Sequence, residues 1–510
     1  MALEEIRAQR LEKLHRIEEA GMDPYPVTSN RTHDVVAFFG DYERLEATKS
    51  PVAIAGRIVS FREHGGAMFV DVNDGSGKVQ AYLQKDVLGE DSFDFFQKNV
   101  DTGDFVEFTG HAYTTKRGMR SVHVEAWRML VKSLLPIPDQ WFGLKDEDER
   151  YRKRYLDILL SEETANRIRR RSKFWNVIRT YLLEQGYVEV ETPVLETTTG
   201  GAEAAPFVTH HNALDIDVYL RISAGELWQK RLMVAGLPKV FEIGRIFRNE
   251  GMSAEHAQDY TQLEFYEAYK DYRQGMDMIR DLYRRIADEV YGTRVFTVRG
   301  VQVDFNKEWE QYDFSALMQN AYKFDPREAE AMSIEELHAL LAKATVPTEG
   351  VQEVGRAVDL LWKKIRKDIV GPGFLVNVPV YLEPLAKKDP SDKRVVERFQ
   401  VMLAGSEMGK GFSELNDPID QAERFKRQGD LRAAGDEEAQ MPDAEYVEAL
   451  EYGMPLAFGF GVSERLFSTL EGVPIREGQI FPLMRPRPLR VEVSEKVDVS
   501  DKAKIDRITG

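Results

Sequence analysis

From Pro51 to Val131 the sequence is a series of short segments in which apolar and polar residues alternate, and each segment ends at a glycine or an Asx turn signal. One of these turns is NDGSG, at residues 73–77. Alternation with a period of two is typical of strands that bury one face, and short turns of this kind join such strands into hairpins. The pattern therefore predicts an all-β module of about five strands that closes into a small barrel.

A five-stranded barrel of the OB type can bind an oligonucleotide on one face, where aromatic side chains stack on bases and polar groups add a few hydrogen bonds. Arg62, Phe69 and Gln80 are the candidate contacts in this sequence. Two interpretations of Phe69 remain open at this point, because an aromatic ring can also fill the interior of a barrel.

The charge balance limits the possible partners. The chain has 69 Lys and Arg against 86 Asp and Glu, a formal net charge of −17, which argues against binding DNA or RNA over its whole surface. The absence of cysteine is consistent with a cytoplasmic location and leaves carboxylates as the main ligands available to a metal ion. No run of about 18 apolar residues is present, so we expect no membrane partner.

The 510 residues are enough for two or three domains. A charged N-terminal helix and the barrel form the first predicted domain, which ends in a proline-punctuated linker near residues 136–150. The spacing then becomes helical, and later a long stretch of helical periodicity suggests an insertion. The predicted domains are 1–140 and 150–488, with the helical insertion at about 271–367 and a polar tail at 489–510.

The stretch KVFEIGRIFRNEGMSAEHAQDYTQLEFYEAY, residues 239–269, is predicted to form a hairpin of two strands joined by a polar connection. Arg248 stands where the first strand ends. An arginine there can present a planar, permanently charged fork to a phosphate whose charge grows during displacement. The alternative is a structural arginine paired with a carboxylate.

Four further residues point to a binding pocket. Arg465 begins a helix-forming run after a glycine-rich segment, where the backbone can closely approach a planar ligand or a second phosphate. Glu226, Glu264 and Glu414 lie in apolar, strand-like surroundings, where a lone carboxylate is unfavourable unless it meets a cation. Together the three carboxylates suggest a pocket for an amine.

In this order, GYVEVETPVL, FRNEG with the downstream TQLEFYEAY, and FGFGVSERLF resemble the three signature motifs of class II aminoacyl-tRNA synthetases. RYRKRYLDILL and GFSELNDPIDQAERF narrow the resemblance to bacterial lysyl-tRNA synthetases, and it extends from about Ile6 to Arg487. The resemblance implies an α+β fold in a homodimer. An N-terminal OB-fold would read the anticodon, and an antiparallel sheet flanked by helices would form the catalytic domain.

The enzyme implied by this resemblance is a lysine–tRNA ligase. The carboxylate of L-lysine would attack the α-phosphate of ATP to give lysyl-adenylate, and the terminal adenosine of lysine tRNA would then take the aminoacyl group. Mg²⁺ would bridge the phosphates. Two alternatives remain open: a relative that charges a different amino acid, and a catalytically altered paralogue that binds tRNA.

The resemblance also implies roles for individual residues. For ATP these are Arg248 at the α-phosphate, Arg465 at the γ-phosphate, Glu250 and Tyr260 about the adenine, and His256 at the departing phosphates. For lysine they are Glu226 at the α-amino group, with Glu264, Tyr266, Lys410, Phe412 and Glu414 around the rest of the substrate and Glu414 at its side-chain ammonium. Glu407 matches a metal ligand. Arg62, Phe69 and Gln80 match residues that hold the anticodon, which favours the stacking role of Phe69.

Several positions near the predicted active site depart from the family pattern. Glu255 stands where an arginine is expected, and Gln400 stands where a second metal-binding glutamate is expected. One negative charge is gained and one is lost, which suggests that the two changes compensate each other. Lys410 replaces an asparagine, so it can either pair with the substrate carboxylate or reach into the pocket and imitate the substrate. One extra residue precedes Glu226 and another precedes Arg465.

Overall fold

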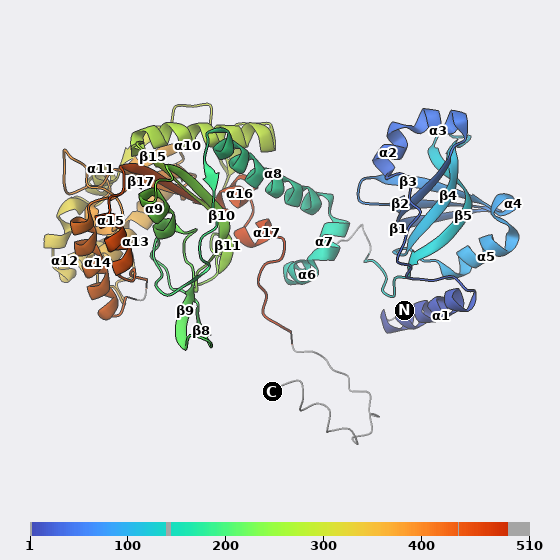
Figure 1. Ribbon diagram of the computed structural model, residues 1–510, viewed down its shortest axis with the longest axis horizontal. Helices are drawn as coiled ribbons and strands as arrows, with labels where there is room; N and C mark the ends of the chain where they lie inside the picture. Colours follow the sequence, from blue (N-terminus) through green and yellow to red (C-terminus); the bar gives the residue numbers. More distant parts are fainter. Residues whose placement is uncertain (1–2, 139–143, 437, 488–510) are drawn as a thin grey trace, which may run out of the picture. The chain divides into compact units, whose positions relative to one another are not determined.

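The computed structural model of the chain describes residues 3–138, 144–436 and 438–487 (Figure 1). The chain divides into two units, Met1–Lys145 and Asp146–Gly510, each with its own hydrophobic core. The predicted polar tail at 489–510 lies outside the described residues, as does the middle of the predicted linker.

The first unit is built on a closed barrel whose strands are hydrogen-bonded in the order β1-β2-β3-β5-β4. Side chains alternate between the interior and the surface, so that Met68, Val70 and Val72 of β2 are buried. Since β1 also pairs with β4, the predicted five-stranded barrel is confirmed. Its elements are α1 (Leu3–Glu19), α2 (Val35–Gly40), α3 (Tyr42–Thr48), β1 (Pro51–His64), β2 (Ala67–Asn73), β3 (Lys78–Gln84), α4 (Lys85–Leu88), α5 (Glu90–Asn99), β4 (Phe105–Thr114) and β5 (Arg120–Val131).

The second unit is organised by an eight-stranded sheet in the order β14-β15-β16-β17-β18-β11-β10-β6, which is antiparallel except at its two end pairs. Helices α8 and α10 run along one face of this sheet (Figure 1) and share a core with it. The predicted α+β class is therefore confirmed. These elements are α8 (Glu162–Glu184), β6 (Val188–Glu189), β10 (Lys239–Phe247), β11 (Asp259–Ala268), α10 (Tyr272–Ile286), β14 (Glu310–Asp313), β15 (Gly373–Val376), β16 (Arg398–Leu403), β17 (Ser406–Ser413) and β18 (Ala457–Ser463).

The predicted hairpin at residues 239–269 is confirmed, because β10 and β11 pair antiparallel along their whole length. Successive side chains of β11 point to opposite faces of the sheet. Leu263 and Phe265 join the core shared with α8 and α10, whereas Glu264 and Tyr266 point to the other face. The hairpin thus carries polar groups to the face that the two helices leave uncovered.

The stretch predicted as a helical insertion, 271–367, is more varied than its periodicity suggests. Its first helix, α10, packs on the main sheet, while β12 and β13 form a separate hairpin and β14 joins the sheet edge. The later helices surround a second core that includes Leu337, Leu361 and Trp362. Helical periodicity identifies a buried face but not the core against which it packs. The elements are η1 (Ala287–Tyr291), β12 (Val295–Val298), β13 (Val301–Asp304), α11 (Phe314–Tyr322), η2 (Pro326–Ala331), α12 (Ile334–Lys343), α13 (Val354–Ile365) and η3 (Arg366–Asp368).

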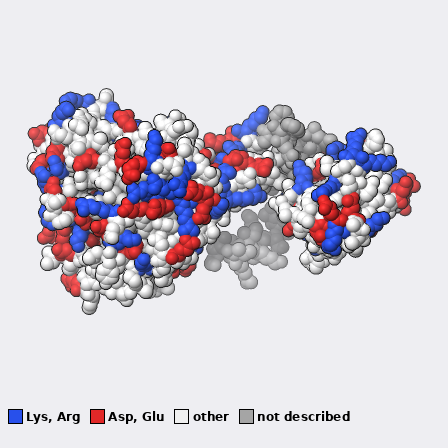
Figure 2. Space-filling model, turned by 90° about the horizontal axis from the view of Figure 1, so that it is seen from above, with Lys and Arg blue, Asp and Glu red and all other residues white. Residues whose placement is uncertain are grey.

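The other elements of the second unit include a small sheet in the order β7-β9-β8. Acidic and basic side chains are interspersed over the face of this unit seen in Figure 2. Among the described helices, none is both long and apolar enough to cross a membrane. The remaining elements are α6 (Glu147–Arg152), α7 (Arg154–Leu160), β7 (Leu195–Glu196), β8 (Val208–His211), β9 (Ile216–Leu220), α9 (Glu226–Val234), η4 (Val380–Leu382), α14 (Pro418–Ala433), α15 (Ala444–Glu451), α16 (Arg465–Leu470) and α17 (Ile475–Gly478).

Candidate active site

A cavity of about 470 Å³ opens on the face of the sheet opposite α8 and α10. It is lined by residues of β11, β16, β17 and β18, and by α13 on another side. Glu250 and His256 lie on the connection between β10 and β11, outside the lining, and the His256 ring is 2.7 Å from the Ser253 hydroxyl. The predicted residues that line the cavity are Glu226, Arg248, Tyr260, Glu264, Tyr266, Gln400, Glu407, Lys410, Phe412, Glu414 and Arg465.

Gly459 in β18 leaves space for two side chains at the floor of the cavity, Glu414 and Tyr266. A Cβ atom at Gly459 would lie 2.1 Å from Oε1 of Glu414 and 2.5 Å from a ring carbon of Tyr266. Any side chain there would displace both groups. The glycine is therefore required by the close approach of β18 to the pocket.

Glu226 and Glu414 share an ion pair with Lys230, a residue that the sequence analysis did not include. The Lys230 ammonium is 2.8 Å from Oε1 of Glu226 and 2.5 Å from Oε2 of Glu414, and the lysine side chain has no exposed surface. The ring centres of Tyr266 and Phe412 are 5.7 and 5.3 Å from the same nitrogen. Burial alone would lower the pKa of Lys230, but the two carboxylates raise it above its usual value, so the group stays charged.

Glu264 has no cationic partner among the described residues. Its contacts are neutral donors: the Ala224 backbone N–H at 3.0 Å, the Tyr266 hydroxyl at 3.2 Å and the Gln262 amide. Burial and the neighbouring Glu226 raise the pKa of Glu264 to about 8. Three carboxylates therefore share one internal ammonium, and the floor of the cavity can accept a further positive charge.

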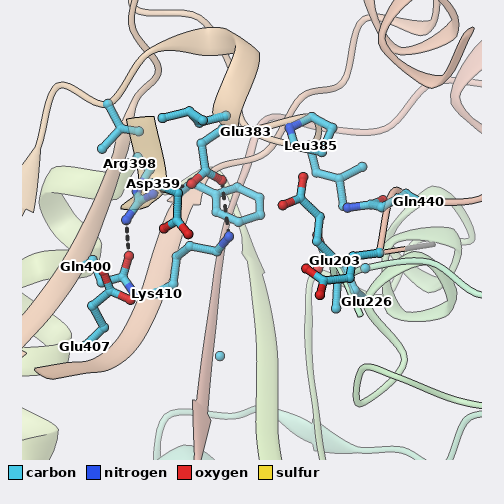
Figure 3. Close-up of a pocket in the computed structure, with 18 of the residues that line it drawn as sticks. Glu203, Glu226, Asp359, Glu383, Leu385, Arg398, Gln400, Glu407, Lys410 and Gln440 are labelled. Atoms are coloured by element: carbon cyan, nitrogen blue, oxygen red, sulfur yellow. Dashed lines mark hydrogen bonds and ion pairs between the residues drawn. The ribbon is translucent and has the colours of Figure 1, made fainter. Parts of the chain in front are cut away.

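One wall of the cavity carries a chain of polar contacts (Figure 3). Arg398 contacts both Glu383 and Gln400, and the Lys410 ammonium is 3.2 Å from Oε2 of Glu383. The Lys410 side chain is 45% exposed, so it belongs to the rim, and it pairs with Glu383 rather than with Glu226, Glu264 or Glu414. Glu226 lies on the opposite side in Figure 3.

Arg248 lies directly after β10, as its position in the hairpin predicts. Its Nε donates a hydrogen bond to the Ile222 carbonyl at 3.2 Å, and its guanidinium carbon is 5.8 Å from the centre of the Tyr260 ring. No carboxylate of the described residues forms an ion pair with Arg248, which argues against the purely structural role. The guanidinium remains available to a ligand in the cavity.

Arg465 is the first residue of α16, and one residue, Glu464, separates it from the end of β18. The preceding residue, Glu464, is 1% exposed, and its Oε2 is 2.5 Å from a guanidinium nitrogen of Arg171 on α8. This buried pair fixes the start of α16 against the core of the sheet. The Arg465 guanidinium itself lies 3.6 Å from Oε2 of Glu255.

The two predicted metal ligands do not form a metal site by themselves. Oε1 of Glu407 accepts a hydrogen bond from the Trp362 indole at 2.7 Å, and Oε2 pairs with Arg366 at 2.9 Å. The amide oxygen of Gln400 is occupied by Arg398. Over the described ranges, no three or more Asp, Glu, His or Cys side chains gather in a way that could hold a metal ion. This donor set does not fit a resident metal ion.

The barrel carries its predicted contact residues on the outer surface. Arg62 is paired across strands with Phe69, Phe69 with Tyr82, and Tyr82 with His123. The rings of Phe69 and Tyr82 stack at 4.9 Å, and those of Tyr82 and His123 at 5.4 Å. Gln80 lies two residues before Tyr82 on the same face of β3. Phe69 therefore does not fill the barrel interior. Tyr82 is its neighbour through the register between β2 and β3, which alternation within one strand does not give.

The family comparisons agree with both units. A model of class II tRNA synthetases for D, K and N matches residues 146–485, and a model of OB-fold nucleic acid binding domains matches residues 52–130. The chain therefore belongs to the class II tRNA synthetases. It is 40% identical to the lysine–tRNA ligase of Thermosipho africanus, over 95% of this chain and 97% of the relative. It is also 40% identical to the lysine–tRNA ligase of Fervidobacterium nodosum (100% and 99% covered) and 41% identical to that of Moorella thermoacetica (95% and 98% covered).

We predict that Lys230→Met lowers the free energy of unfolding by about 3–5 kcal/mol, because it leaves two buried carboxylates without their cation. Adding Glu414→Gln should restore part of this loss, since it removes one of the unpaired charges. Equilibrium denaturation of the full chain measures both effects.

A matched control is Lys426→Met, which breaks an exposed i, i+4 pair with Asp430 and should change stability by about 0.5 kcal/mol or less. A Lys230→Met loss no larger than that of the control would show that the buried ion pair does not support the pocket.

Proposed function

We propose that this chain is a lysine–tRNA ligase. It activates L-lysine with ATP, forming lysyl-adenylate and diphosphate, and transfers the lysyl group to the 3′ end of lysine tRNA. The observation that carries the proposal is the charge imbalance in the cavity, where, among the residues that the structure describes, Glu226, Glu264 and Glu414 have only the Lys230 ammonium as a cation. The α-amino group and the side-chain ammonium of lysine together supply the two missing positive charges, whereas a neutral or acidic side chain leaves a buried carboxylate unpaired.

The geometry of β11 supports the placement of the two substrates. Tyr260, Gln262, Glu264 and Tyr266 share one face of this strand at intervals of about 7 Å. We place the adenine of ATP at Tyr260 and the lysine side chain at Glu264 and Tyr266, so that the reacting carboxylate and the α-phosphate meet between them near Arg248.

For lysine, the proposed contacts divide by charge. Glu226 receives the α-amino group at the N-terminus of α9, and Glu264 and Glu414 surround the side-chain ammonium, with Phe412 beside the apolar part of the substrate. The rim position of Lys410 supports pairing with the substrate carboxylate rather than imitation of the substrate.

In the first step, an oxygen of the lysine carboxylate forms a bond to the α-phosphorus, and the bond from that phosphorus to the diphosphate oxygen breaks. Negative charge moves to the leaving diphosphate. Arg248 can neutralise charge at the α-phosphate because no carboxylate in the described part of the chain pairs with it, while Arg465 and His256 would face the leaving group. Glu250 would lie about the adenine.

Magnesium is proposed only as the ion that accompanies ATP. Mg²⁺ is commonly held by one or two carboxylates together with substrate phosphates, and it neutralises their charge when bound. Of the two predicted metal ligands, only Glu407 is a carboxylate, and its ion pair with Arg366 would have to break before it could contact Mg²⁺.

The second step requires lysine tRNA, and the neighbouring side chains of Arg62, Phe69 and Tyr82 on the outer face of the barrel support binding of its anticodon. Arg62 offers a cation, Phe69 and Tyr82 offer ring faces, and Gln80 offers hydrogen bonds. A homodimer, as the family resemblance implies, and a cytoplasmic location, with which the absence of cysteine is consistent, complete the proposal.

Exchange of labelled diphosphate into ATP, measured with each of the twenty amino acids in turn, tests the proposed activity. We expect exchange with L-lysine and a rate at least about 100-fold lower with every other amino acid, because a buried unpaired carboxylate costs several kcal/mol. Exchange with a different amino acid, or with none, would contradict the proposal and favour the altered paralogue.

The role of Phe69 is tested by Phe69→Leu. Loss of one stacked base should raise the KM for lysine tRNA about 5- to 100-fold and leave diphosphate exchange unchanged, because stacking on an aromatic side chain contributes about 1–3 kcal/mol per base. Phe39→Leu, which changes a partly buried ring elsewhere in the same unit, is the control. An equal effect of the two variants would mean that Phe69 only stabilises the barrel.

A further inference from the structure

Three separate turns meet at the carboxylate of Glu255. The first is the β10–β11 connection, which carries Glu255 itself. The second joins β12 to β13 and carries Arg299, whose guanidinium pairs with Oε1 of Glu255. The third joins β16 to β17, and the Ser406 hydroxyl after it donates to Oε1 of Glu255 at 2.9 Å. Arg299 also donates to the Ser406 hydroxyl at 2.6 Å, so the three groups form a closed set of contacts.

The same carboxylate also contacts Arg465, an arginine that lines the cavity. Its second oxygen, Oε2, lies 3.6 Å from the guanidinium of Arg465, so Glu255 bridges two arginines with one oxygen each. Burial, Arg366 and Arg465 lower the pKa of Arg299, which places three guanidinium groups in one neighbourhood. An oxygen anion between two guanidinium forks is the arrangement in which arginines bind phosphate.

The backbone at Arg299 is unfavourable for an arginine. Its φ is 51° and that of Gly300 is 81°, so a two-residue turn joins β12 to β13 with both residues in the left-handed region. Such turns favour Asn, Asp or Gly at the first position, and other residues adopt this conformation only at an energetic cost. Unfavourable backbone conformations that persist in this way are concentrated at functional sites.

The ion pair itself does not explain why this conformation is kept. The side chain of Arg299 is 48% exposed and that of Glu255 is 21% exposed, and a pair this accessible to water contributes little to stability. It is also a pair that a stronger anion can readily displace.

We propose that Arg299 is a further binding residue for the terminal phosphate of ATP, and that Glu255 occupies the place of a phosphate oxygen between Arg299 and Arg465 until ATP displaces it. Position 255, where the family pattern has an arginine, carries a carboxylate in this chain. Arg299 on the β12–β13 turn would therefore supply the missing cation to the phosphate. This inference rests on the proposed function, because that function determines which end of ATP reaches Arg465.

The test compares three single variants of the full chain: Arg299→Gln, Glu255→Gln and, as a control, Arg294→Gln. Arg294 lies just before β12 and pairs with Asp288 on the surface, so its variant removes the same charge from the same hairpin. For each variant we would measure the Kd of Mg-ATP by titration without lysine, and the KM values for ATP and lysine in diphosphate exchange.

Arg299→Gln should raise the Kd and KM for ATP about tenfold or more, as expected for a lost hydrogen bond between charged groups, with the KM for lysine changed less than about twofold. Glu255→Gln should act in the opposite direction and lower the Kd for ATP about threefold or more, because the competing anion is removed. Arg294→Gln should leave all three constants unchanged.

Two results would overturn the inference. One is an ATP affinity of Arg299→Gln equal to that of Arg294→Gln. The other is weaker ATP binding by Glu255→Gln, which would mean that the carboxylate only positions the arginines. The titration needs no amino acid. If the wild-type chain binds ATP but shows no lysine-dependent exchange, the ligase activity is refuted, and the Kd values of the variants still show whether Arg299 binds ATP.

Discussion

The ion pair of Lys230 with Glu226 and Glu414 is the interaction on which the active-site pocket depends. Burying carboxylates is costly unless cations accompany them, and Lys230 supplies one fully buried ammonium between two of them. Glu264 has no such ammonium among the described residues, because its partners are neutral hydrogen-bond donors. With all three carboxylates ionised, the floor of the cavity is thus two positive charges short, and it favours a substrate that brings positively charged amines.

The β10–β11 hairpin joins this acidic floor to a cationic end. Glu264 lies in the middle of β11, while Arg248 follows β10 at the end of the hairpin that also carries Tyr260. Because the sheet fixes the spacing along β11, the distance between the amine-binding and phosphate-binding groups is set by strand geometry. Gly459, opposite Tyr266 on the neighbouring strand, leaves room for the Tyr266 ring and the Glu414 carboxylate at the acidic end.

Alternation and turn signals were sufficient to predict the barrel and the hairpin at 239–269, since both are local patterns along the chain. They also placed Phe69 on a strand, although only the closed barrel shows that its ring faces outward. Lys230 escaped prediction because a lysine on a helix normally faces solvent, and its burial depends on Glu414, far along the chain. Arg299 was not predicted either, because its partner Glu255 is also distant in the sequence and only folding brings the two together. The charge differences at Glu255 and Gln400 were visible in the sequence, but their partners were not.

The central claim is that the floor of the cavity lacks positive charge that lysine supplies. Burial raises the pKa values of both Glu264 and Glu414 to about 8, so the neighbouring carboxyl groups share protons at pH 7 that must leave when an ammonium binds between them. Calorimetric titration with L-lysine at pH 7, in two buffers with different ionisation enthalpies, measures the protons released. We predict release of up to about one proton per lysine, which falls toward zero as the pH rises above 8 and is smaller in Glu264→Gln. Lysine binding without proton release at pH 7, and with the same affinity in Glu264→Gln, would contradict the account.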